Sequence, residues 1–206
     1  NASNLYSHLT AAMSTQNQAV ASNNRLGAQD DDILFITDCE VADIFKASDG
    51  TTATSLLHTT ADNTSNNLSK AYQVDAQVML FQYYAYYVKD TGRVNASGAP
   101  IYSLYQMDVT GTEREMVEGV ENMQITYGVD SDNDGAADSY STDSAVNAAN
   151  NWPQVVTMKI SLLLNSIDNV TRTSEAYSFL GAVTTPNDRI LRRQWDSFIQ
   201  LRNRSL

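Results

Sequence analysis

The chain has 206 residues, of which 13 are lysine or arginine and 24 are aspartate or glutamate, so its net charge at neutral pH is −11. With 42% hydrophobic and 18% charged residues, its composition is that of a folded domain and excludes wholesale disorder. It holds no uninterrupted apolar run of the roughly 18 residues that a membrane span requires. The negative charge repels phosphate, so we expect no direct nucleic-acid binding, and basic partners or cations fit the sign better.

The first predicted element is an amphipathic helix over residues 5–20, where apolar or small side chains recur every three or four positions. A polar linker over residues 21–32 follows. From residue 33 to residue 39 apolar side chains run almost continuously, which predicts a strand at the centre of a sheet. Residues 41–47 predict its neighbour.

The middle of the chain predicts a surface loop and then a hairpin. Residues 49–70 are rich in serine, threonine, asparagine and aspartate around a short apolar patch, which is typical of a long loop with one short strand. Residues 76–89 and 101–109 are rich in β-branched and aromatic side chains and predict two strands that pair with each other.

The second half predicts a sheet. Strict alternation over residues 122–129 and 156–164 indicates two strands, each with one buried face and one wetter face. Asp143 predicts the N-cap of a short helix that ends before Trp152. The spacing in residues 190–206 fits a helix and a strand equally well.

These elements together predict an α+β fold, with one helix followed by a mostly antiparallel sheet. We expect a single domain over residues 1–206, divided into a helix and linker in residues 1–30 and a β-rich body in residues 31–206.

Residues that could support catalysis are scarce. His8 and His58 have no second ligand at metal-binding spacing and are expected to be solvated. Cys39 lies between two carboxylates, so it is predicted to be a buried or half-buried structural thiol, or else to pair with a cysteine outside this chain. Without a nucleophile motif or a phosphate-binding loop, we expect no enzymatic activity and no catalytic residue.

The sharpest local signal is a run of carboxylates. Asp130, Asp132, Asp134 and Asp138 occupy positions 1, 3, 5 and 9 of a calcium loop, with Gly135 between them. The twelfth position holds a serine instead of the bidentate glutamate, and the flanking segments read as strands, which argues against an EF-hand. Two interpretations stay open: a Ca²⁺ site with these four ligands, or an acidic hairpin turn. No other cofactor is expected.

Two clusters of side chains suggest surface contacts. The aromatic run could stack on sugars, but packing inside a sheet is the interpretation we favour; its members are Phe81, Tyr83, Tyr84, Tyr86 and Tyr87. Five of the nine arginines fall near the end of the chain and either pair with the acidic remainder of the domain, which we favour, or form a docking strip for an acidic neighbour; they are Arg189, Arg192, Arg193, Arg202 and Arg204.

Several segments resemble, in the same order, the PilW family of type IV pilus minor pilins, a group of pilin- and pseudopilin-like proteins. The segments are DILFITDC at 32–39, ADIF at 42–45, MVEGVENMQITYGVDSDNDG at 116–135, Trp152, VVTMKISLLL at 155–164, LRR at 191–193 and LRNR at 201–204.

This resemblance implies a pilin-like fold in which an N-terminal helix packs on an antiparallel sheet and the last segment is a strand. It also implies an inner-membrane helix and a peptidase cleavage site upstream of Asn1, both outside this sequence. The implied role is a structural subunit that joins other minor pilins and the fibre to initiate or cap pilus assembly, which supports twitching motility. The implied location is the periplasmic face of the inner membrane and the extracellular pilus of a Gram-negative bacterium.

An adhesive or ligand-binding β-domain at a pilus tip or cell surface is the alternative function. The tyrosine-rich strand, the long polar loop and the acidic turn favour it, and its ligand binding would depend on calcium if the turn holds the ion.

Overall fold

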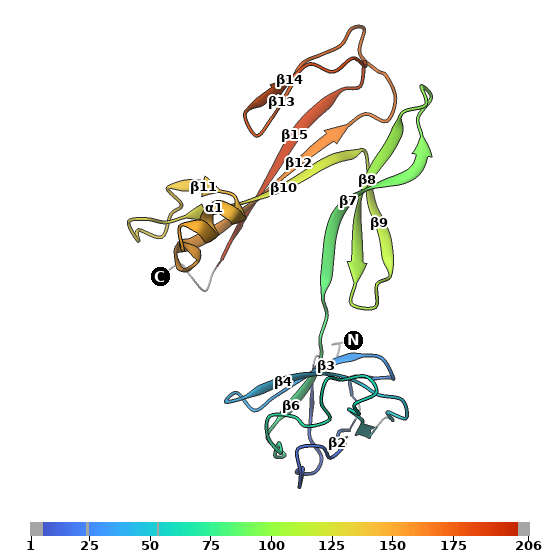
Figure 1. The fold of residues 1–206 in the computed structure, drawn as a ribbon, viewed down its shortest axis with the longest axis vertical. Coiled ribbons are helices and arrows are strands. Elements are labelled where there is room, and N and C mark those ends of the chain that lie inside the picture. The colour runs from blue at the N-terminus through green and yellow to red at the C-terminus, as the bar shows by residue number, and fades with distance from the viewer. Residues whose placement is uncertain (1–5, 24, 53, 202–206) are drawn as a thin grey trace. The chain divides into compact units, whose positions relative to one another are not determined.

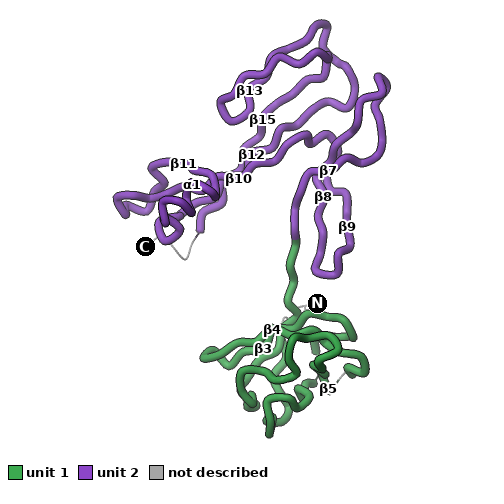
Figure 2. Tube along the Cα trace, in the orientation of Figure 1, with its two compact units in different colours: residues 1–84 green, residues 85–206 purple. Residues whose placement is uncertain are grey.

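The computed structural model describes residues 6–23, 25–52 and 54–201. The chain divides into two compact units, residues 1–84 and residues 85–206 (Figure 2). The expectation of a single domain over residues 1–206 stays a prediction.

Antiparallel strands make up most of the described chain (Figure 1). The helical elements within the described ranges are α1, Asp143–Ala148, and the short 3-10 helix η1, Trp152–Gln154. The predicted α+β, pilin-like fold with an N-terminal helix is therefore wrong, and the architecture is mostly antiparallel β. No helix in the described ranges combines the length and the apolar character that crossing a membrane requires.

Unit 1 is built from short strands around its own core. They form a four-stranded sheet in the order β1-β6-β3-β4 and a separate pair, β2-β5. The bounds are β1 Ser7–His8, β2 Val20–Ala21, β3 Ile33–Thr37, β4 Ala42–Lys46, β5 Ser55–Leu56 and β6 Gln77–Leu80.

The helix predicted over residues 5–20 is not formed. This segment instead contains β1, the first residue of β2, and the turns and irregular backbone between them. Leu5 lies outside the described residues. Leu9, Met13 and Val20 are buried as their spacing suggested. The backbone around these residues, however, forms hydrogen bonds with more distant parts of the chain. Thr10 N donates to Ala21 O over 2.9 Å, and Met13 N donates to Tyr72 O over 2.9 Å. The serine, threonine and asparagine between them have low helix propensity, so tertiary pairing wins.

The predicted strands at residues 33–39 and 41–47 are confirmed as β3 and β4, with β3 inside the sheet between β6 and β4. Leu34 and Ile36 are fully buried. The side chains that alternate with them are only half-buried, so one face of β3 is covered more completely than the other.

Unit 2 begins with a three-stranded sheet in the order β7-β8-β9. Its strands are β7 Tyr84–Val94, which starts at the last residue of unit 1, β8 Pro100–Asp108 and β9 Glu113–Glu118. The paired strands β7 and β8 confirm the predicted hairpin in part, because residues 77–80 of the predicted first strand form β6 in the sheet of unit 1. The strand β9 was not predicted. Every residue of β9 is exposed, so β9 lacks the apolar alternation that identifies a half-buried strand.

The second sheet of unit 2 has the order β11-β10-β12-β15. Its strands are β10 Val120–Val129, β11 Ser139–Ser141, β12 Val155–Asn165 and β15 Arg192–Gln200. A small hairpin of β13 Tyr177–Phe179 and β14 Ala182–Thr184 precedes β15. The last segment is therefore a strand, as the resemblance implied.

The short helix α1 also matches a prediction, one residue displaced. Its N-cap is Thr142, whose side chain accepts a hydrogen bond from Ala145 N, while Asp143 is the first helical residue. Val146 of α1 packs with Val129 and Val155 in a small core at one end of the sheet.

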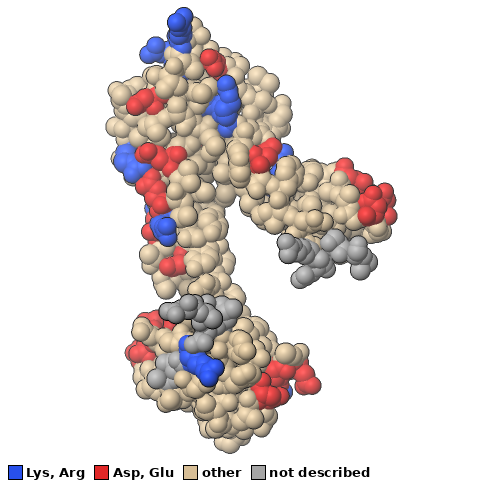
Figure 3. Space-filling model, turned by 180° about the vertical axis from the view of Figure 1, so that it is seen from behind, with Lys and Arg blue, Asp and Glu red and all other residues tan. Residues whose placement is uncertain are grey.

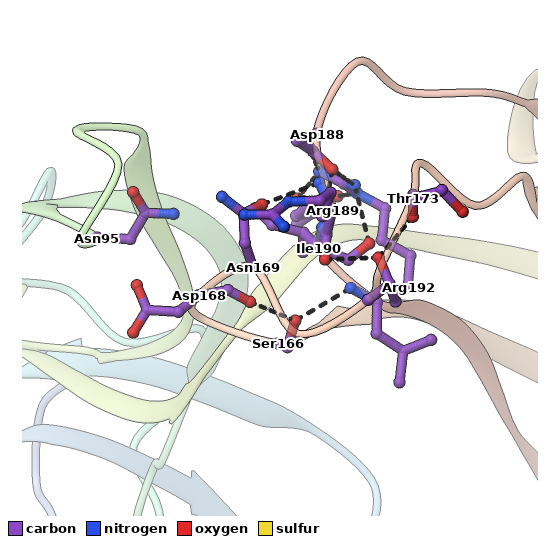
Figure 4. A network of polar contacts seen from close by, with 12 residues as sticks. Asn95, Ser166, Asp168, Asn169, Thr173, Asp188, Arg189, Ile190 and Arg192 are labelled. Atoms are coloured by element: carbon purple, nitrogen blue, oxygen red, sulfur yellow. Dashed lines mark hydrogen bonds and ion pairs between the residues drawn. The ribbon is translucent and has the colours of Figure 1, made fainter.

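A polar network connects the segment after β12 with the segment before β15 (Figure 4). Arg189 N donates to Asn169 Oδ1 over 2.8 Å, and Leu191 N donates to Ser166 Oγ over 3.0 Å. Asn95, in the turn between β7 and β8, donates from Nδ2 to the Ile167 carbonyl over 3.0 Å. This network fastens the β7–β8 turn to the end of the second sheet.

Candidate functional site

The acidic turn, residues 130–138, joins β10 to β11. Asn133 and Gly135 take positive φ angles of 60° and 90° there, a conformation that asparagine and glycine tolerate. Asp130 is only 5% exposed. Its carboxylate accepts the backbone N–H groups of Asp134 over 3.2 Å and Gly135 over 2.9 Å, which explains the tight local fold.

The turn brings together three of the four predicted metal ligands. One carboxylate oxygen from each of Asp130, Asp132 and Asp138 lies within 4.8 Å of the other two. Asp134 is not part of this group, and its Oδ1 accepts the N–H of Ala136 over 2.8 Å. Acidic residues gather at this end of the sheet (Figure 3). Three clustered carboxylates fit the hard oxygen ligands that Ca²⁺ prefers. Calcium binding at this turn stays a prediction.

The pKa values of two carboxylates in the turn are shifted in opposite directions. Ser131 donates from both N and Oγ to Asp138 Oδ2, which holds the pKa of Asp138 below its usual value. The backbone N–H of Asp134 favours the ionised form of Asp132, but the negative charges of Asp134 and Asp138 outweigh it and raise the pKa of Asp132. A bound cation would relieve this repulsion.

One face of the second sheet is largely apolar, with Ser197 of β15 as a polar residue opposite Ile160. In the register, Tyr127 pairs with Met158 and Met158 with Ile199, while Met123 pairs with Leu162 and Leu162 with Trp195. Directly paired residues project to the same side of a sheet. We call six of these residues the open apolar face: Ile125, Met158, Ile160, Leu162, Trp195 and Ile199.

None of the six residues of the open apolar face is fully buried. Trp195 is 50% exposed and Ile199 is 41% exposed, and the other four are half-buried. Apolar surface of this kind gains about 25 cal/mol for each Å² that a partner removes from water. A contiguous exposed apolar surface marks a protein interaction site.

The opposite face is more polar and is covered at one end. Ser161 and Leu163 are 1% and 4% exposed. The segment around the β13–β14 hairpin lies on this side, since Leu180 N donates to Gln194 Oε1 over 2.7 Å. The prediction that the apolar side of these strands is the buried one holds at one end, where Val129 and Val156 are 4% and 3% exposed, whereas Ile125, Met158, Ile160 and Leu162 are only half-buried.

Two predictions about isolated residues are also wrong. His58 is buried at 4% exposure, packs against Phe45, and has its Nε2 2.9 Å from the Gln18 carbonyl oxygen. Cys39 is exposed in the β3–β4 turn with a φ of 71°, so it is not the buried or half-buried thiol that we expected. Its pairing with a cysteine outside this chain stays a prediction. Both positions depend on how the unit 1 strands meet, which local sequence does not report. His8 is exposed, as expected.

The aromatic run is largely exposed, so the prediction that it packs inside a sheet is wrong. Phe81, Tyr83, Tyr84 and Tyr86 are between 38% and 53% exposed. On the sheet face that carries Tyr87, charged side chains form a ladder, in which Tyr87 and Lys89 both donate to Glu113. Charges of both signs follow the β7-β8-β9 sheet in Figure 3.

For Arg192, one of the five terminal arginines, the prediction that they pair with acidic residues is confirmed. It donates two hydrogen bonds to Glu121, both shorter than 3 Å, and two to Asp188, of 2.7 and 2.9 Å. Its guanidinium carbon also lies 5.5 Å from the centre of the Tyr177 ring. Arg202 and Arg204 lie outside the described residues.

Glu121 and Asp188 could not be recognised as partners of Arg192 from the sequence pattern. Glu121 occupies an irregular position in β10 where the register shifts between Val120 and Asn122. Such a bulge sends a side chain out of strict alternation. The break in the alternation at the start of β10 is the one sequence signal that could have identified Glu121.

A family model described as type IV pilus-assembly protein W, PilW, matches residues 85–203, which is more than half of the chain. No curated protein and no solved structure matches it. The matched residues begin with unit 2 and include β10, β12 and β15, which carry the open apolar face. The chain belongs to the PilW family of type IV pilus-assembly proteins.

Proposed function

We propose that this protein is a non-enzymatic minor pilin that helps to initiate or cap the type IV pilus fibre, and that it does so by docking other pilus subunits on the open apolar face. Membership of a pilus-assembly family supports an association with pilus components and a location at the cell envelope or surface. The periplasmic side of the inner membrane and the pilus itself are the locations that this role requires.

The observation that carries the proposal is the exposure of the open apolar face. Trp195 and Ile199 remain accessible, at 50% and 41% exposure, on the apolar face of the sheet. Large aromatic residues at the centre of an interface contribute most of its binding energy, about 2 kcal/mol or more for each such residue. An assembly subunit needs such a surface, whereas the residues of this face include no acid, base or nucleophile for catalysis.

The test places a charge on the open apolar face in the full-length protein expressed from its own gene. Trp195→Glu and Ile199→Glu should each strongly reduce surface pili, counted by electron microscopy, and twitching. Phe198→Glu is the matched control, because Phe198 is 60% exposed on the same strand and faces the opposite way.

Immunoblots must show equal protein levels for the three variants. Normal piliation in the two variants of the open apolar face would refute the proposed docking surface. Normal piliation after deletion of the whole gene would refute the assembly role itself.

An adhesive function is the second candidate, and the exposure of Tyr83, Tyr84 and Tyr86 favours it. Exposed tyrosine rings stack on sugars and other planar ligands. A glycan-binding screen with and without calcium distinguishes the two roles, because an assembly subunit has no specific glycan ligand.

A further inference from the structure

A hollow of about 400 Å³ lies in unit 2 between the tyrosine-rich strands and the start of β10. One wall comes from β7 and β8 through Tyr86, Val88 and Tyr102, together with Tyr87; the other comes from β10 through Glu121, Asn122 and Met123. The volume is that of a small ligand pocket, which ranges from about 300 to 1,000 Å³.

The aromatic wall is accessible and held in place. Tyr86 is 49% exposed and Tyr102 is 37% exposed. Gln106 Nε2 donates to the Tyr86 hydroxyl over 2.6 Å, which fixes the position of that side chain. Tyrosine rings present a negative electrostatic face that attracts cations.

The opposite wall is negative. Glu121 belongs to a cluster in which one guanidinium, of Arg192, is shared by two carboxylates, of Glu121 and Asp188, so the cluster carries a net charge of −1. None of the residues that line the hollow is a lysine or an arginine. The chain as a whole carries −11, so long-range attraction also favours a cation.

The same unit already uses this kind of contact internally. The Lys89 ammonium lies 5.4 Å from the centre of the Tyr105 ring, and the Arg192 guanidinium lies 5.5 Å from that of Tyr177. Tyr86 and Tyr102 are not among the rings covered by a cation in the described part of the chain.

We propose that this hollow receives a basic side chain, arginine or lysine, from a partner protein. The proposal rests on the assembly function proposed above and names the chemistry of one contact. The cation lies against the tyrosine wall and is attracted by the Glu121 carboxylate, while the stem of the side chain packs on Val88 and Met123.

The experiment uses NMR titration of the isotopically labelled protein with the peptide acetyl-Gly-Arg-Gly-amide. The neutral isostere acetyl-Gly-citrulline-Gly-amide is the control ligand, and the lysine peptide is a second probe. We expect shifts of the backbone amides of Tyr86, Tyr102 and Glu121 with the basic peptides, weaker at high salt, and no saturable shift with citrulline.

Tyr102→Leu should weaken binding of the arginine peptide about two- to five-fold, the size of one cation–π contact at a partly exposed site. Tyr83→Leu is the matched control, because Tyr83 is 53% exposed and does not line the hollow; it should bind normally.

Equal binding of the citrulline peptide, an unchanged affinity in Tyr102→Leu, or no shift at up to 10 mM peptide, a concentration about ten thousand times the Kd of a micromolar site, would overturn the proposal. These results leave piliation untouched, so a failed hollow and a failed assembly role are distinguishable. Loss of binding in Tyr83→Leu as well would show that the shifts do not come from the hollow.

Discussion

Replacement of Arg192 by alanine should destabilise unit 2 more than any other single change to its charged residues. The Arg192 side chain is only 9% exposed, and it holds the carboxylates of Glu121 and Asp188, which are 22% and 36% exposed. Removal of the arginine leaves two neighbouring carboxylates without a cation and removes the contact with the Tyr177 ring.

The magnitude follows from the burial of the three groups. Loss of one partner from a buried ion pair costs about 3 to 5 kcal/mol, because a buried charge is left uncompensated. Water reaches Asp188 and part of Glu121 and screens them, so we expect about 2 to 4 kcal/mol. For a unit of this size that corresponds to a decrease in Tm of about 8 to 16 °C.

The assay is thermal and chemical denaturation followed by tryptophan fluorescence. Both tryptophans, Trp152 and Trp195, lie in unit 2, so the signal reports on that unit. Arg193→Ala is the control, because Arg193 is an exposed neighbour on the other face of the sheet and should change the stability by less than about 0.5 kcal/mol.

The double variant Arg192→Met, Glu121→Met provides a further check. It removes the buried carboxylate together with its cation, so it should be more stable than Arg192→Ala. If Arg192→Ala is no less stable than Arg193→Ala, the charged cluster is not a structural element and the reasoning fails.

Three further predictions concern the acidic turn, unit 1 and the second sheet. Calcium should raise the Tm of the fluorescence transition, and Asp138→Asn should abolish this effect while Asp134→Asn, outside the carboxylate cluster, retains it; calorimetry without binding at millimolar Ca²⁺ would count against the site. The hydrogen bond from Lys70, together with backbone N–H groups, lowers the pKa of Asp38 to about 2. Its stabilisation is therefore present above the usual aspartate pKa and is lost as the pH falls through about 2; an NMR titration should show this midpoint, and Lys70→Met should move it upward. Gly128→Ala would place a methyl group 2.1 Å from a side-chain atom of β12 and should cost about 1 to 3 kcal/mol through overpacking, measured by urea denaturation.

The alternation of side chains predicted the strands of unit 2 well. Residues 122–129 and 156–164 form β10 and β12 in the expected antiparallel sheet. The spacing within residues 5–20 misled in unit 1, because Leu9 reaches the core from a β-bridge to Ser22 and Met13 from irregular backbone, and neither lies in a helix. Period alone cannot separate these cases when the backbone hydrogen-bond partners lie far along the chain.

In the acidic turn, the sequence motif predicted part of the arrangement of the carboxylates. The spacing of its carboxylates placed Asp130, Asp132 and Asp138 in one cluster, as the calcium interpretation expected. It could not show that Asp134 would direct its carboxylate to the Ala136 backbone, because that choice depends on the turn geometry that follows from Gly135.

The sequence by itself determined the β-rich character of the body, the position of the acidic turn and the likeness to pilus-assembly proteins, because all three follow from local pattern. Alternation shows that a strand has two unlike faces. Only tertiary packing placed the β13–β14 hairpin against one end of the more polar face of the β10-β12-β15 sheet. It also brought Glu121, Asp188 and Arg192 together, since side chains separated by up to 71 residues meet only when strands pair.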